Sequence, residues 1–434
     1  MFGRHSQRVA DVAMVGLAVG PAGIAGLAFA TVFYGLGNGF SLGLAGGTIG
    51  QVSQRFGADQ PERLDLAVKQ SVWVGTVIAL PFTLVFWQYA EPLLALLADT
   101  PETVELGATY LRILSVAMVF NFFNTVSSRT LAGADDTVIA MAVRATGAFT
   151  NIFFNAILIF GLGLGIEGAA IGTVVAELLV SGCFIYGFVL GGLPIVGEFP
   201  IHLSLSGPYF DRGLSKQLMR LSLPLMGRSL ARMAANFPLF ALLAVFGPTV
   251  VAAFEVGRRI RSLMRSTGAG FSMAASSLVG QALGRDDELA ADDYSRDSIR
   301  ISAATYLVSV VLVLVFAGPL THLFVDDPAV VSQTTPFIRI AAISFLGYGM
   351  DSTFTGILKA AGDNQWALYG RLFGKYIAML PIIYLGTVTP LGILAVYVAI
   401  IAETWSAGTI TGYRVRSGVW KQVSRRHRPA AVDD

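Results

Sequence analysis

The feature that most constrains this chain is a succession of about twelve long apolar runs separated by short polar breaks. A helix needs roughly 20 apolar residues to cross the hydrocarbon core of a bilayer, and most of these runs reach that length. Only 13% of the residues are charged, far below the roughly 25% of an ordinary soluble domain. The sequence therefore predicts an all-α polytopic membrane protein. The predicted helices are residues 8–20, 22–50, 69–90, 106–131, 138–161, 166–190, 216–247, 249–278, 298–318, 334–358, 366–386 and 391–412.

The segments at alternate breaks between these runs carry Lys and Arg, while the opposite connections carry none. Cytoplasmic loops of membrane proteins are enriched in Lys and Arg, so the pattern indicates which loops face the cytoplasm. It predicts a multi-pass protein of the cell (inner) membrane with both termini in the cytoplasm. The basic segments are 51–69, 129–144, 212–220, 285–300, 359–371 and 414–428.

The sequence also repeats itself at a constant offset of 227 residues (248 − 21 = 227). Matched pairs include Pro21 and Pro248, Gln54 and Gln281, Gly57 and Gly284, Leu131 and Leu358, and Arg144 and Arg371. Each half holds six predicted helices, an even number, so both halves share one orientation. We expect two six-helix lobes, residues 1–200 and 201–434, related by a pseudo-two-fold axis along the membrane normal.

The same offset predicts that the first helix is truncated. The first helix of the second half begins near Lys216, and its counterpart would begin roughly ten residues before Met1. The first helix is then short by about three turns, with Arg4, His5 and Arg8 where apolar residues are expected. A start upstream of Met1 is the explanation we favour, and a short or tilted helix with the lipid adapting to it is the alternative.

Several charged residues lie inside the predicted helices, where an ionised side chain costs about 2.5–3.5 kcal/mol on insertion scales. Glu177 and Glu403 lie at nearly equivalent repeat positions, and they are as well explained by helix contacts as by proton transfer. Arg228 and Arg232 lie one turn apart and favour a water-filled cavity over packing. The candidates for a substrate cavity are Glu255, Arg228, Arg232, Asp351 and Glu403. For Glu255 an equal alternative is a neutralising pair with Arg258 or Arg259.

Asp11 is a single carboxylate in the first helix, and a carboxylate that faces a cavity can bind H+ or Na+. Na+ is a hard cation that also needs neutral oxygen donors. Asn151, Asn155 and Thr173 are candidates for these donors, and the two asparagines lie one helical turn apart. The alternative is that the asparagines only hydrogen-bond a neighbouring helix.

Other classes of protein fit the sequence poorly. The single Cys183 and four scattered histidines exclude a disulfide framework and predict no metal site beyond Na+. No phosphate-binding GxxxxGK[ST] motif appears, so an ATP-driven pump would need another subunit. We predict no enzyme and no cofactor, because no nucleophile and base can be assembled at one membrane depth. The expected partners are a small organic substrate and the lipid bilayer, with no nucleic acid, and the protein is expected to be a monomer.

Several motifs resemble those of the MATE (multidrug and toxic compound extrusion) transporters. Residues 10–16, with Asp11, Val15 and Gly16, resemble that family's first-helix signature. Residues 52–58 and 279–284 resemble its paired loops, residues 131–137 its Leu-x-Gly-x-Gly-Asp-Thr turn with Asp135 in place of Gly, and residues 165–173 the start of its sixth helix. The resemblance covers nearly the whole chain and implies the prokaryotic type.

The resemblance implies two six-helix lobes that export organic compounds by alternating access in exchange for H+ or Na+. It also implies a cation site at Asp11, Asn151, the Asn155 position and Thr173. The family has Asp at the position of Asn155, so this chain keeps one carboxylate instead of two. Glu177, four residues beyond Thr173, is a candidate to compensate.

The arginine-rich helix at 249–278 is a second departure, and it favours anionic or zwitterionic substrates. Two other functions stay open at this point. One is flipping of lipid-linked sugars by a relative in the same superfamily, because buried Arg would suit a pyrophosphate group. The other is a membrane scaffold or sensor without a cavity, in which Asp11 is packed against protein.

Overall fold

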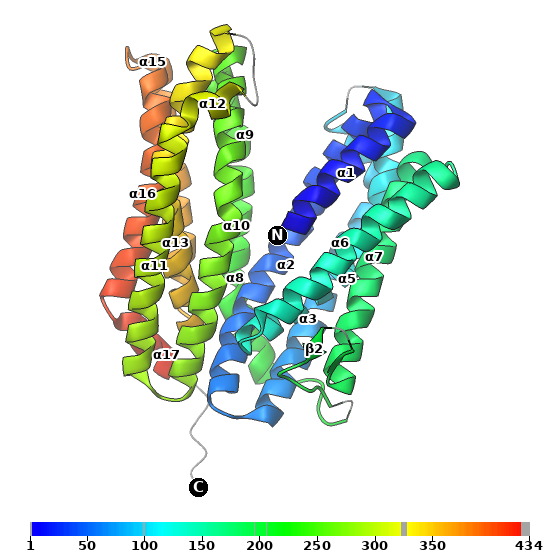
Figure 1. Ribbon diagram of the computed structural model, residues 1–434, viewed down its shortest axis with the longest axis vertical. Helices are drawn as coiled ribbons and strands as arrows, with labels where there is room; N and C mark the ends of the chain where they lie inside the picture. Colours follow the sequence, from blue (N-terminus) through cyan, green and yellow to red (C-terminus); the bar gives the residue numbers. More distant parts are fainter. Residues whose placement is uncertain (1, 99, 195, 205, 323–327, 427–434) are drawn as a thin grey trace. The chain divides into compact units, whose positions relative to one another are not determined.

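The computed structural model describes residues 2–98, 100–194, 196–204, 206–322 and 328–426 (Figure 1). By its internal contacts the chain forms two compact units. The first unit comprises Met1–Thr48 and Pro61–Arg220, and the second unit comprises Ile49–Gln60 and Leu221–Asp434. The lobes predicted as residues 1–200 and 201–434 stay a prediction.

The first half of the chain is helical apart from one small hairpin, and Figure 1 shows its long helices running alongside one another. Helix α5 packs against α3 and α7, and α1 packs against α6 and α7. The elements are α1 (Phe2–Val19), α2 (Pro21–Gly57), α3 (Pro61–Gln88), α4 (Ala90–Ala95), α5 (Pro101–Gly133), α6 (Thr137–Ala156), the π-helix η1 (Ile157–Gly161), α7 (Gly165–Leu190), and the hairpin of β1 (Gly192–Leu193) and β2 (Gly197–Glu198).

The second half follows the same plan, with α13 packed against α10, α11 and α16. Its elements are α8 (Arg212–Ala234), α9 (Asn236–Ala244), α10 (Pro248–Gly284), α11 (Glu288–Val315), α12 (Ala317–His322), α13 (Pro328–Ala361), α14 (Gln365–Leu372), the π-helix η2 (Phe373–Met379), α15 (Leu380–Val388), α16 (Ile393–Arg416) and α17 (Val419–Arg425).

All twelve predicted apolar runs coincide with helices, some of them broken by a kink or a π-helical turn. Within the described residues, seven helices are long and apolar enough by themselves to cross a membrane. Many large apolar side chains are exposed on the units, among them Leu84, Phe149, Val308 and Val315. Apolar surface of this extent is typical of contact with lipid. The chain is therefore an all-α polytopic membrane protein, as predicted.

The 227-residue repeat is also visible in the helix boundaries. Helices α2 and α10 begin at a proline and end at a glycine, and both of their ends are 227 residues apart. The same offset relates α3 to α11 and α4 to α12. The turns after α2 and α10 both contain an aspartate in the left-handed region, Asp59 at φ 52° and Asp286 at φ 62°. Aspartate is one of the few residues besides glycine that tolerate this conformation.

The paired motifs that end α2 and α10 pack against each other within the second unit. A Cβ atom on Gly57 would lie 2.1 Å from the carbonyl oxygen of Gln281, and one on Gly284 would lie 2.0 Å from that of Gln54. Because 54 and 57 are the repeat partners of 281 and 284, the contact is reciprocal. The glycines therefore recur in both halves because the two backbones approach too closely for any side chain.

We predict that Gly57→Ala and Gly284→Ala each destabilise the protein by about 1–3 kcal/mol, as overpacked helix contacts do. Thermal unfolding of the purified protein in detergent measures the effect. Gly270→Ala is the matched control, because a Cβ there meets nothing within 4 Å. Equal unfolding temperatures for all three variants would contradict this account of the motif.

Candidate functional site

A chain of hydrogen bonds links three helices of the first unit around Asp11. Asn155 Nδ2 donates to Asp11 Oδ1 at 2.7 Å and to Asn151 Oδ1 at 3.3 Å. Asn151 Nδ2 in turn donates to Thr173 Oγ1 at 3.0 Å. The side chains come from α1, α6 and α7. The structure thus brings together four of the five residues predicted for cation binding.

Local structure sets this geometry. Asp136 caps α6 by accepting a hydrogen bond from the backbone N–H of Ile139 at 2.8 Å, which fixes where the helix begins. Asn151 and Asn155 then follow one turn apart on a buried face, and η1 begins two residues after Asn155. Turns of π-helix often adjoin functional positions, because they redirect the side chains next to them.

The environment of Asn155 is tightly enclosed. Asn151 and Asn155 are fully buried and Asp11 is 7% exposed. The Oδ1 atom of Asn155 is buried without a hydrogen-bond partner, and a Cβ on Gly172 would lie 1.9 Å from it. An unsatisfied buried acceptor is costly, and such atoms often mark a site for an ion or water. Oxygen atoms of one carboxylate, two amides and one hydroxyl are ligands that suit Na+ or another hard cation, and the carboxylate alone suits H+.

Glu177, the fifth residue predicted for cation binding, takes part in a different group of hydrogen bonds. Its Oε2 accepts a hydrogen bond from Asn124 Nδ2 at 2.6 Å. Ser181 Oγ donates to Asn124 Oδ1 at 2.9 Å. No hydrogen bond between described residues joins the Glu177 carboxylate to Asp11, Asn151 or Thr173. Spacing alone suggested one face with Thr173, but the carboxylate turns toward α5. Its role in cation binding stays a prediction.

A second polar centre lies in the second unit, around Asp351 on α13 and Glu403 on α16. Glu403 pairs with Lys375 at 2.9 Å, Arg261 at 3.1 Å and Arg371 at 3.3 Å. Asp351 pairs with Arg371 at 3.4 Å and with Arg228, and accepts a hydrogen bond from Thr411 Oγ1 at 3.3 Å. Arg371 therefore joins the two carboxylates into one network. We call these six charged residues the charged network: Asp351, Glu403, Arg228, Arg261, Arg371 and Lys375.

The other predicted cavity residues lie at different places. Arg232, one turn beyond Arg228 on α8, is half-buried and forms no hydrogen bond or ion pair with any described residue. Glu255 pairs with Arg258 on its own helix at 2.8 Å, with side chains 32% and 41% exposed. Glu255 thus forms the neutralising pair that was its alternative interpretation, and among the described residues it has no ion pair with the charged network.

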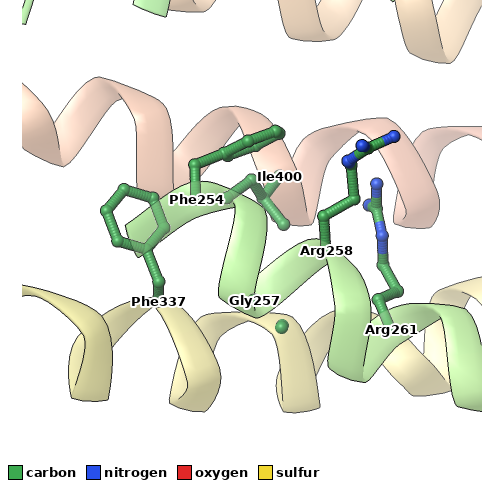
Figure 2. A pocket seen from close by; sticks show the side chains of 7 residues that line it. Phe254, Gly257, Arg258, Arg261, Phe337 and Ile400 are labelled. Atoms are coloured by element: carbon green, nitrogen blue, oxygen red, sulfur yellow. The ribbon is translucent and has the colours of Figure 1, made fainter. Parts of the chain in front are cut away.

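Figure 2 shows the side chains that line a small hollow, among them Arg261 of the charged network. Its walls come from α10, α13 and α16, and the guanidinium groups of Arg258 and Arg261 both point toward α16. Arg261 also pairs with Glu403, so the hollow adjoins the network directly. The lining residues are Phe254, Gly257, Arg258, Arg261, Phe337, Ala341 and Ile400.

Sequence reasoning missed Arg371 and Lys375 as members of this site. The charge pattern assigns Arg371 to the basic cytoplasmic segment 359–371, although Arg371 lies five residues inside the run 366–386. Lys375 lies one turn further along, in η2. The signal was available, because a Lys inside an apolar run is as costly as the carboxylates that were singled out.

Comparisons with known proteins place this architecture. The profile of the MatE family matches residues 6–157 and 224–385, more than two thirds of the chain. The probable multidrug resistance protein NorM of Thermotoga maritima is 24% identical, over 82% of this chain and 77% of its own length. The multidrug export protein MepA of Staphylococcus aureus is 23% identical, over 82% of this chain and 76% of its own length.

Solved structures show the same fold. A multidrug resistance MATE family transporter of the MOP superfamily in an outward-facing conformation has a TM-score of 0.88 at 22% identity, covering 97% of this chain and 94% of its own. A MOP superfamily transporter from Pyrococcus furiosus, whose binding pocket has reverse polarity, has a TM-score of 0.87 at 22% identity, covering 97% of this chain and 93% of its own. Twelve transmembrane helices are a feature of this fold.

We predict that Gly172→Ala disturbs the Asp11 centre, because the new methyl group forces the Asn155 side chain away from Asp11. Losing that hydrogen bond to a charged group is expected to cost about 1.5–3 kcal/mol. Thermal unfolding in detergent detects the loss. Gly182→Ala, on the same helix, is the control, because a Cβ there meets nothing within 4 Å. If both variants unfold like wild type, Asn155 is not held as described.

We also predict that Glu403→Gln destabilises the second unit strongly. It leaves three cations without their shared carboxylate, and breaking a buried ion pair typically costs about 3–5 kcal/mol. Glu255→Gln is the control, since its half-exposed pair is expected to contribute about 0–1 kcal/mol. Denaturant or thermal unfolding distinguishes the two variants, and similar small effects would contradict a buried network.

Proposed function

Because this chain belongs to the MatE family, whose members are membrane transporters and not enzymes, we propose that it exports small organic compounds in exchange for H+ or Na+. The names of its relatives support the export of drugs, since NorM is a multidrug resistance protein and MepA a multidrug export protein. We further propose that the protein works as a monomer in the cell membrane with both termini in the cytoplasm.

The observation that carries the coupling is the hydrogen-bonded chain from Asp11 through Asn155 and Asn151 to Thr173. An ionised carboxylate in a membrane helix is costly unless a cation or donor neutralises it. In the present arrangement the Nδ2 group of Asn155 supplies the donor. Binding of H+ or Na+ to Asp11 would neutralise the carboxylate in place of this donor.

The centre also offers a way to link cation binding to a change of conformation. Asp11, Asn155 and Thr173 lie on three different helices, so a cation that binds among them alters the contacts of α1 with α6 and α7. A ligand shifts a conformational equilibrium by its difference in affinity for the two states. We propose that the cation favours one orientation of the transporter and that its release favours the other.

A single carboxylate limits the stoichiometry of this centre. The resemblance implies Asp where this chain has Asn155, and an amide cannot carry a second proton or a second negative charge. We therefore propose that one cation at a time is bound at this centre. The amide at position 155 also avoids the repulsion that a second carboxylate at that position would exert on Asp11.

We predict that Asp11→Asn abolishes gradient-driven transport. The assay uses proteoliposomes with imposed pH or Na+ gradients and follows two fluorescent probes of opposite charge, dansylglycine (anionic) and dansylcadaverine (cationic). Gradient-driven movement of a probe is expected to fall at least about tenfold, the effect of losing roughly 1.4 kcal/mol of coupling.

Glu167→Gln is the matched control, because Glu167 is an exposed carboxylate in the first turn of α7. It is expected to transport like wild type. Normal gradient-driven transport by Asp11→Asn would exclude Asp11 as the coupling carboxylate.

A further inference from the structure

The charged network of the second unit contains more positive than negative charge. Four cations, Arg228, Arg261, Arg371 and Lys375, surround two carboxylates, Asp351 and Glu403, which leaves a net charge of +2 (4 − 2 = 2). The carboxylates are 1% and 2% exposed, and Arg371 and Lys375 are 7% and 4% exposed. Uncompensated charge in such surroundings is strongly unfavourable, so it calls for an anion.

The two carboxylates have little capacity left to compensate. Glu403 already contacts three cations, and Asp351 contacts two together with the hydroxyl of Thr411. One hydrogen-bond donor of the network nevertheless has no acceptor. The Nε atom of Arg371 is buried without a hydrogen-bond partner. In a native protein an orphaned buried donor points to a missing acceptor.

Arg232 adds a further positive charge with no counter-ion. It lies one turn from Arg228 on α8 and forms no ion pair with the described part of the chain. Three other cations, Arg371, Arg265 and Arg228, lie close enough to act on its guanidinium group electrostatically. An arginine that only neutralised a carboxylate would have that carboxylate beside it, so Arg232 has a different role.

The 227-residue repeat shows that the fold does not require this excess of charge. Arg371 corresponds to Arg144 in the first half, but Lys375 corresponds to Ala148 and Arg261 to Tyr34. Asp351 corresponds to Asn124. The corresponding helices of the first half therefore pack without the charges of Lys375, Arg261 and Asp351, so the excess of positive charge is specific to the second half.

From these observations we propose that the second unit binds the anionic group of the transported compound, a carboxylate, sulfonate or phosphate, at Arg232 and Arg371. The planar guanidinium group holds such anions through paired hydrogen bonds. The proposal deepens the proposed function by naming the substrate class. The proposal concerns the anionic group alone, because the hollow at Phe254, Phe337 and Ile400 is only large enough for about one water molecule.

Equilibrium binding to the purified full-length protein in detergent, without any ion gradient, tests the site. Wild type is expected to bind dansylglycine at least about tenfold more tightly than dansylcadaverine. Arg232→Gln is expected to weaken dansylglycine binding about tenfold or more, the usual effect of losing one hydrogen bond to a charged group. Arg259→Gln, which removes an exposed arginine of α10, should bind like wild type.

One further variant and one further measurement distinguish anion binding from a purely structural role of Arg232. Arg232→Lys keeps the charge without the planar group and is expected to retain part of the binding. Without a probe, Arg232→Gln should unfold at or above the wild-type temperature, because no ion pair is lost. Unchanged dansylglycine affinity in Arg232→Gln, or binding of dansylcadaverine alone by wild type, would overturn the proposal.

The source of the anion is distinguished by competition. Displacement of dansylglycine by inorganic pyrophosphate in detergent supports a soluble anion, while inhibition in nanodiscs of phosphatidylglycerol but not phosphatidylcholine supports a lipid headgroup. Failure of the coupling proposal is separable, because Asp11→Asn should keep dansylglycine binding even though it loses gradient-driven transport.

Discussion

The interior of a membrane protein tolerates charge only where another charge or a hydrogen bond balances it, and this constraint organises both units. In the second unit Asp351 and Glu403 hold Arg228, Arg261, Arg371 and Lys375 together, and these side chains come from separate helical segments. Removing any one partner leaves buried charge behind. In the first unit the same constraint is met differently, because one carboxylate, Asp11, accepts a hydrogen bond from the amide of Asn155, which belongs to a chain that reaches Thr173 through Asn151.

Both halves use one helical scaffold, and the differences between them are confined to a few positions. The reciprocal contact of Gly57 with Gln281 and of Gly284 with Gln54 requires the same small residues twice. By contrast, the polar positions have diverged, as Asn124 and Asp351 show. The two halves thus share their packing but differ in polar chemistry, with one carboxylate among amides in the first unit and four cations around two carboxylates in the second.

The sequence predicts the helices well because the free energy of burying a segment in lipid depends on each of its residues separately. Hydropathy measures this quantity directly. The helices extend beyond the apolar runs, as α10 does to Gly284, because their polar ends reach past the hydrocarbon core. The Asp11 centre followed from the family resemblance. Side-chain pairing across the fold did not follow, since nothing local shows that Glu403 meets Arg261 or that Glu177 turns to Asn124. Such partners depend on how helices pack.

The central claim is that coupling and substrate binding reside in different units. The most direct test uses proteoliposomes of Asp11→Asn and compares two activities. One is counterflow of dansylglycine, which is driven by preloaded unlabelled dansylglycine and needs no ion gradient, and the other is accumulation driven by an ion gradient. The account predicts that counterflow persists at near the wild-type rate while accumulation is lost. Loss of both activities in a protein that still folds, or persistence of both, would contradict it.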